Sequence, residues 1–130
     1  MQTKVLLGSR LLFGLIFLFF GLNGFLQFIP NPPMAPEAGA LMGAFAKTGY
    51  FFPMIKIIEI AVGVLLLANI FVPFAIVLIT PILIGITTIH LFLNPAGLPM
   101  MIFLHAMHGF LVYGYKQYFS GLFTQKAALA

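Results

Sequence analysis

Four long apolar stretches alternate along the chain with short segments that contain proline, glycine or polar residues. A helix of about 20 residues is long enough to cross the hydrocarbon core of a bilayer. Pro30 follows the first stretch and Pro73 begins the third, which are positions where proline ends or opens a helix. The pattern therefore predicts four transmembrane helices, over about residues 5–29, 50–70, 73–93 and 100–119.

The segment APEAGALMGAFAKTGY, between the first two apolar stretches, predicts one further short helix. Pro36 stands where a helix starts, and Lys47 stands where one ends. Leu41 and Phe45 share one face of such a helix, so we expect it to lie in the membrane interface. The expected fold is therefore all-α: a four-transmembrane-helix bundle in one domain, residues 1–130, with a short interfacial helix between helices 1 and 2.

The chain has 130 residues, of which 62% are hydrophobic and only 6% are charged. A soluble domain has about 25% charged residues because it presents a hydrated surface, so lipid must be the solvent for most of this chain. The net charge is +4, but the six basic residues are scattered rather than grouped with aromatic residues, so we expect no nucleic-acid partner. The lack of cysteine excludes disulfides and thiol chemistry.

The basic residues also predict the orientation of the protein, since lysine and arginine favour cytoplasmic connections. With four spans, Lys4, Arg10, Lys116 and Lys126 lie on the side of the termini, whereas Lys47 lies on the other side. We therefore expect a multi-pass protein of the plasma or inner membrane with both termini in the cytoplasm. The first apolar run is too long for the core of a signal peptide and no small-residue cleavage site follows it, so we expect it to remain as an anchor.

Polar residues are concentrated in the half of the membrane that lies away from the termini. Lys56 and Glu59 are the least expected of them, because a charge inside a bilayer costs several kcal/mol unless it is paired or reaches water. A rise of about 1.5 Å per helical residue places polar residues of all four spans at similar depth, and residues three or four positions apart share a helix face. We therefore predict a shared polar pocket that opens toward the outer side. Its predicted ligand-binding residues are Glu59, Lys56, His105, His108, His90, Asn23 and Gln27. The alternative is a purely structural Lys56–Glu59 ion pair, with the lysine reaching outward to water.

Three histidines and a carboxylate offer donor atoms for a metal ion, but no metal-binding motif such as HExxH is present. We therefore predict no metal site. Two histidines can also ligate haem, but His90 and His108 differ in depth. Ser9 and Ser120 lie at the opposite boundary from every histidine, so serine catalysis is not expected and no catalytic residue is assigned.

Glycines in the apolar stretches predict close packing between helices, as small residues do in membrane proteins. They are Gly14, Gly21 and Gly24 in the first span, Gly63 in the second and Gly85 in the third. Pro81 should kink the third span and free the carbonyl of Val77, which Thr80 or a neighbour can satisfy.

Three segments carry a recognisable pattern: RLLFGLIFLFFGLNGF, KIIEIAVGVLLL and TPILIGITTIHLFLNP. With Arg10, Gly14, Glu59, Gly63 and Pro81 at its main positions, this pattern resembles the DoxX-like family of small membrane proteins. The resemblance implies a four-helix fold. It also implies a range of functions, from the quinone-linked membrane subunit of thiosulfate oxidation to accessory proteins of respiratory or oxidative-stress complexes and, in eukaryotes, receptor assembly. One functional residue, Glu59, carries over as a candidate, whereas the lack of cysteine argues against direct sulfur chemistry.

Two functions are compatible with these features. The first is the binding of a hydrophobic small molecule, a quinone or a lipid-like ligand, in the polar pocket. In this hypothesis the protein is a redox-linked accessory subunit and is not expected to be an enzyme on its own. If it is one, it is a subunit of a quinone-linked oxidoreductase, and the ligand or a partner supplies the electron chemistry. The second is a non-enzymatic scaffold or assembly factor for a partner membrane protein. A transporter would require a homo-oligomer, because each chain has only four spans.

Overall fold

The computed structural model describes residues 2–130, and all regular structure in this range is helical. The helices are α1 (Gln2–Leu26), α2 (Pro36–Lys47), α3 (Phe51–Ala68), α4 (Val72–Phe92) and α5 (Leu98–Gly114). Three short 3-10 helices accompany them: η1 (Pro95–Gly97), η2 (Lys116–Tyr118) and η3 (Ser120–Phe123). The predicted all-α class is confirmed, and so is the short helix between the first two spans.

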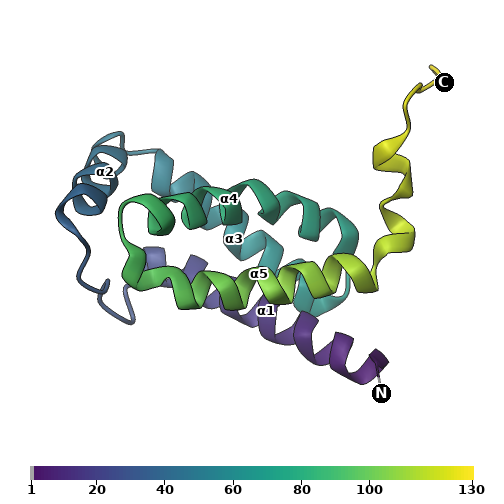
Figure 1. Ribbon diagram of the computed structural model, residues 1–130, viewed down its shortest axis with the longest axis horizontal. Helices are drawn as coiled ribbons and strands as arrows, with labels where there is room; N and C mark the ends of the chain where they lie inside the picture. The colour runs from purple at the N-terminus through teal and green to yellow at the C-terminus, as the bar shows by residue number, and fades with distance from the viewer. Residues whose placement is uncertain (1) are drawn as a thin grey trace.

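The long helices α1, α3, α4 and α5 run alongside one another and form a bundle (Figure 1). Each is long and apolar enough to cross a bilayer, the last together with η1. The chain is therefore a multi-pass integral membrane protein. Both termini lie at one end of the bundle and α2 lies at the other (Figure 1). Helix α1 packs most extensively on α3, and contacts of α3 with α4, α4 with α5 and α5 with α1 close the ring.

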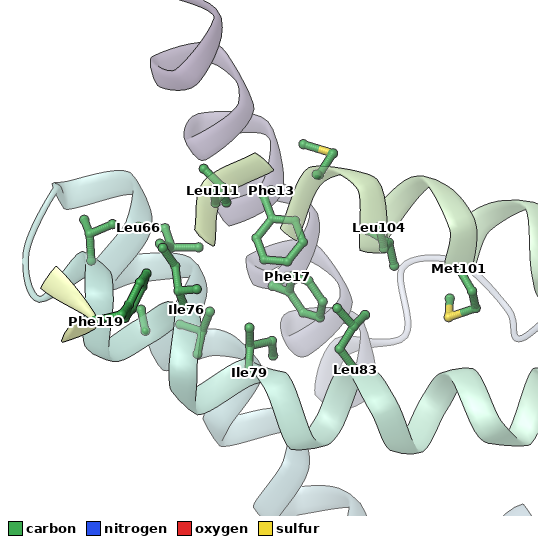
Figure 2. Packing of buried hydrophobic residues seen from close by; sticks show 14 residues of the cluster. Phe13, Phe17, Leu66, Ile76, Ile79, Leu83, Met101, Leu104, Leu111 and Phe119 are labelled. Atoms are coloured by element: carbon green, nitrogen blue, oxygen red, sulfur yellow. The ribbon is translucent and has the colours of Figure 1, made fainter. Parts of the chain in front are cut away.

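Several helix ends differ by a few residues from the predicted ones, and two of these differences bear on the fold. Helix α1 stops at Leu26, because Gln27 takes a left-handed conformation (φ 51°). Helix α5 stops at Gly114, and two 3-10 turns carry the chain on to Phe123. These turns place Phe119 in the buried apolar cluster (Figure 2). If α5 continued as a helix, Phe119 would lie farther from the bundle.

The buried cluster fills the middle of the bundle and draws side chains from all four long helices (Figure 2). Its fully buried members include Phe13, Phe17, Val62, Leu66, Ile79, Leu83 and Leu111. The rings of Phe13 and Phe17 lie one turn apart on α1, with centroids 4.8 Å apart and planes inclined at 59°. This apolar centre separates a polar group at the end of the bundle near the termini from the polar residues of the other half.

Glycines set the close approach of α1 and α3. A Cβ atom added to Gly63 would lie 2.6 Å from the backbone nitrogen of Leu18 and 2.8 Å from the carbonyl oxygen of Gly14. A Cβ on Gly21 would lie 2.9 Å from the backbone nitrogen of Ile60. The two backbones therefore touch directly, which confirms this predicted role of the glycines. For Gly85 that role is wrong, since no atom lies within 4 Å of its added Cβ.

Arg10 is the centre of the polar group near the termini. Its side chain is only 8% exposed, and its Nη1 donates hydrogen bonds to the amide oxygen of Asn69 and, over 3.2 Å, to the hydroxyl of Tyr115. Asn69 ends α3 in a left-handed conformation (φ 59°), which asparagine tolerates better than most residues. Arg10 thus joins α1 to the α3–α4 turn and to the end of α5.

We expect Asn69→Ala to lower the free energy of unfolding by about 2 kcal/mol, because it removes both a hydrogen bond to a buried cation and a residue suited to the left-handed turn. Asn69→Gly keeps the turn and removes only the hydrogen bond, so it should cost about half as much. Unfolding in mixed detergent micelles measures both values. Equal losses in the two variants would contradict this division.

Candidate functional site

A cavity of about 630 Å³ lies between α2, α3 and α4, at the end of the bundle away from the termini. We call it the α3–α4 cavity. Its wall is almost entirely apolar: Leu41, Met42 and Phe45 come from α2, Phe51, Phe52, Met54, Ile55 and Ile58 from α3, and Pro81, Ile82, Gly85, Ile86 and Ile89 from α4. The polar members of the wall are Lys56, Glu59 and Thr88. A concave apolar space with a few polar groups is the usual form of a small-molecule site.

Lys56 and Glu59 form an ion pair at the α3–α4 cavity. The lysine Nζ lies 2.9 Å from the Glu59 Oε2, one helical turn along α3. Glu59 is only 2% exposed and the Lys56 side chain 24%. A Cβ added to Gly24 would lie 2.5 Å from the lysine Cγ, so the aliphatic part of Lys56 passes directly over α1. Glycine at position 24 thus provides the space that lets the ammonium group reach Glu59.

The second oxygen of Glu59, Oε1, accepts no hydrogen bond within residues 2–130, and the ammonium of Lys56 donates only one. The hydroxyl of Thr88, in contrast, is already committed, since it donates to the carbonyl of Gly85 over 2.8 Å. The ion pair therefore supplies the hydrogen-bonding capacity that this wall offers to another molecule: one free carboxylate oxygen and further N–H donors.

Helix α4 leaves the α3–α4 cavity open toward the side of the bundle. Pro81, Gly85 and Thr88 share one face of α4, and all three are exposed. Because Gly85 has no side chain and its Cβ position is empty, this face is hollow rather than filled. Since lipid surrounds the bundle, a molecule dissolved in the bilayer can reach the cavity from this side.

Helix α2 covers the end of the α3–α4 cavity. The ring of Phe45 stacks on Phe51 of α3, with centroids 4.0 Å apart and planes inclined at 13°. The start of α2 is held by Asn94, whose side-chain oxygen accepts the backbone N–H of Ala35 over 3.3 Å. At the other end, Thr48 accepts the backbone N–H of Phe51. Helix α2 is thus held by hydrogen bonds at both ends and covers one end of the α3–α4 cavity.

The histidines of α5 bind threonines of α4. His105 Nε2 lies 2.7 Å from the Thr87 hydroxyl, and His108 Nε2 lies 3.0 Å from the Thr80 hydroxyl. Each threonine hydroxyl already donates to the carbonyl four residues earlier in α4. The threonine oxygens must therefore accept, and we assign a proton to Nε2 of each imidazole. For His108 the same nitrogen lies 3.2 Å from the carbonyl of Ile76.

These contacts divide the predicted shared pocket in two. None of the three histidines lines the α3–α4 cavity. Thr87 and Thr88 are neighbours about 100° apart around α4, so that Thr87 faces His105 while Thr88 faces the cavity. His90 lies near the end of α4, with Nδ1 3.2 Å from the carbonyl of Asn94. The prediction of one pocket is wrong because similar depth does not determine the direction in which a side chain points.

Asn23 and Gln27 are not brought to the α3–α4 cavity either. The side chain of Asn23 accepts the backbone N–H of Ile29 over 2.8 Å and donates to the carbonyl of the same residue over 3.1 Å. It therefore closes the end of α1 by holding the following chain. Gln27 lies beyond the helix and is exposed. The predicted pairing of these residues on one helix face is wrong because α1 ends between them.

In residues 2–130, no three side chains of histidine, aspartate or glutamate lie close enough together to hold a metal ion. The hydrogen bond of Thr80, next to Pro81, differs from the prediction that its hydroxyl can satisfy the carbonyl of Val77. The hydroxyl of Thr80 donates to the carbonyl of Ile76, four residues earlier, and not to that of Val77.

Gly85 and the apolar face of α2 line the cavity although neither is among the ligand-binding residues that the sequence predicts. A signal for both exists in the chain. Leu41, Met42 and Phe45 form an apolar face that a helix lying in the interface can turn toward the bundle. Gly85 lies one turn after Pro81.

Comparison of the chain with protein-family models, with curated proteins and with solved structures gave no match.

Proposed function

We propose that this protein binds a hydrophobic small molecule, a quinone or a lipid-like ligand, in the α3–α4 cavity. One observation carries the proposal: an apolar cavity of about 630 Å³ whose wall contains a buried carboxylate with an unused oxygen. A carboxylate inside a membrane is costly, and such residues mark ligand and ion sites in membrane proteins. The cavity volume is in the range of small-molecule sites.

The wall selects for one polar end on an otherwise apolar molecule. The ammonium of Lys56 donates to a carbonyl or hydroxyl oxygen, and Oε1 of Glu59 accepts from a hydroxyl. The rings of Phe45, Phe51 and Phe52 line the same space and offer flat surfaces to a ring or a chain. The open face of α4 gives access from the bilayer. A quinone head or the head of a single-chain lipid meets these requirements.

The protein acts in this proposal as a binding subunit and not as a complete enzyme. The chain has no cysteine, and His105 and His108 of α5 face threonines of α4 and not the cavity, so the redox chemistry belongs to the ligand or to a partner membrane protein. This role agrees with the resemblance to the DoxX-like family. It also agrees with the orientation that the basic residues predict, with both termini in the cytoplasm and the cavity in the outer half of a plasma or inner membrane.

Mass spectrometry of organic extracts tests the proposal on protein purified in mild detergent. We expect a ligand at about one molecule per chain. Gly85→Phe should lower its amount about tenfold, since the ring occupies the cavity. Gly109→Phe is the matched control, because Gly109 is also exposed and free of contacts but lies on α5 outside the cavity. This control should retain the ligand.

Glu59→Gln tests the polar end separately, because it keeps the shape of the side chain and removes its charge. We expect weaker retention of the ligand than in the unmodified protein. Equal ligand content in Gly85→Phe and Gly109→Phe would contradict the proposal. An empty cavity together with a stable partner in a pull-down would favour the scaffold function.

A further inference from the structure

A second cavity, of about 370 Å³, lies between the start of α1 and the end of α5, near the termini. We call it the α1–α5 cavity. Thr3 and Leu6 line it from α1, and Phe110, Tyr113 and Lys116 line it from the other side. Leu6 also packs against Gly114, where the two helices meet. The cavity lies at the end of two membrane-spanning helices, which is the depth of lipid headgroups.

The charges around the α1–α5 cavity are all positive. The ammonium of Lys116 lies 4.6 Å from the centre of the Tyr113 ring, and this contact leaves its hydrogen-bond donors free. The chain has only two acidic residues. Glu37 is in α2, at the other end of the bundle, and Glu59 is paired at the α3–α4 cavity. Among residues 2–130, neither acidic side chain therefore lies at this cavity.

A buried cation, Arg10, lies at the same end of the bundle as the α1–α5 cavity but is not part of its wall. Arg10 follows Leu6 by one turn of α1, and its partner Tyr115 directly precedes Lys116. Both partners of Arg10, Asn69 and Tyr115, are neutral, and its Nε is buried without a hydrogen bond among the described residues. A buried charge is unfavourable unless another charge compensates it. This end of the bundle therefore holds two cations, Lys116 and Arg10, that form no ion pair with an acidic side chain of residues 2–130.

We propose that the α1–α5 cavity binds the phosphate headgroup of an anionic phospholipid. Lys116 and the hydroxyl of Thr3 contact the phosphate, and the negative charge also compensates Arg10. Leu6 and Phe110 form the apolar part of the cavity and contact the acyl chains, which a free phosphate lacks. Basic cavities between transmembrane helices are recognised sites for such lipids. This site is separate from the α3–α4 cavity and does not depend on the function proposed there.

Native mass spectrometry tests the site on the full chain in nanodiscs of phosphatidylcholine and phosphatidylglycerol. We expect phosphatidylglycerol to remain bound preferentially. Lys116→Gln should lower its retention about fivefold, which is the effect of one cation near an anionic headgroup. Lys126→Gln is the matched control, because it makes the same charge change at the same end of the chain but outside the cavity. It should leave retention unchanged.

A second variant, Thr3→Trp, keeps every charge and fills the cavity, so it should lower retention as well. Equal losses in Lys116→Gln and Lys126→Gln would show general attraction to the surface and overturn the site. Full retention in Thr3→Trp would overturn it too. Inorganic phosphate, added to nanodiscs of phosphatidylcholine alone, should not raise the melting temperature. An increase that Lys116→Gln abolishes would overturn the assignment to a lipid.

Discussion

Lys56→Met should lower the free energy of unfolding by about 3–5 kcal/mol, the cost of leaving one member of a buried ion pair without its partner. Glu59 is 2% exposed, and its only hydrogen-bond donor in residues 2–130 is the ammonium of Lys56. The methionine side chain still covers Gly24, as the aliphatic part of Lys56 does. The loss in the free energy of unfolding therefore measures the removal of the charge and not a change in packing. Unfolding in mixed micelles, or steric trapping in bicelles, measures the difference.

The double variant Lys56→Met with Glu59→Gln is the control for this experiment. It removes both charges at once, so it should be more stable than Lys56→Met alone even though it carries one more substitution. The coupling between the two positions should then reach about 2 kcal/mol or more. A loss below about 1 kcal/mol in Lys56→Met would mean that water, and not the lysine, compensates Glu59.

Gly63→Ala should cost about 3 kcal/mol, because the added methyl group would meet backbone atoms of α1 that cannot move independently. The new Cβ would lie 2.6 Å from the nitrogen of Leu18 and 2.8 Å from the carbonyl oxygen of Gly14. Helices α1 and α3 would have to separate, and the contact of Lys56 with Gly24 lies on the same interface. We therefore expect lower stability, measured by unfolding, together with weaker ligand retention at the α3–α4 cavity.

Gly109→Ala is the matched control for Gly63→Ala. Nothing lies within 4 Å of its added Cβ, and alanine favours the helical conformation by up to about 1 kcal/mol. This variant should be as stable as the unmodified protein or slightly more stable. If both alanines had the same effect, direct contact between the backbones of α1 and α3 would not be what limits the size of residue 63.

Hydrophobic length and glycine placement made most of the fold predictable. A stretch such as residues 73–93 is too apolar for water and long enough for a bilayer, and α4 (Val72–Phe92) follows it closely. Gly14 and Gly63 indicated a close contact because small residues are what membrane helices use for it. The end of α1 was less predictable, since it depends on Asn23 holding the chain at Ile29, a local contact that hydropathy does not detect.

The candidate site was predictable only in part. Lys56 and Glu59 stood out because charges inside an apolar stretch need a reason, and both line the cavity. His105 and His108 satisfied the same test of depth and spacing, yet they face Thr87 and Thr80 across the α4–α5 interface. Depth follows from counting residues, whereas direction around the bundle depends on how the helices pack against one another.

Asn94 connects the start of helix α2 to the end of helix α4. Its side-chain oxygen accepts the backbone N–H of Ala35 at the start of α2, and its carbonyl lies 3.2 Å from Nδ1 of His90 at the end of α4. A ligand that displaces α2 would therefore also act on the residue that contacts His90. Binding in the α3–α4 cavity would then be coupled through Asn94 to the connection between α4 and α5.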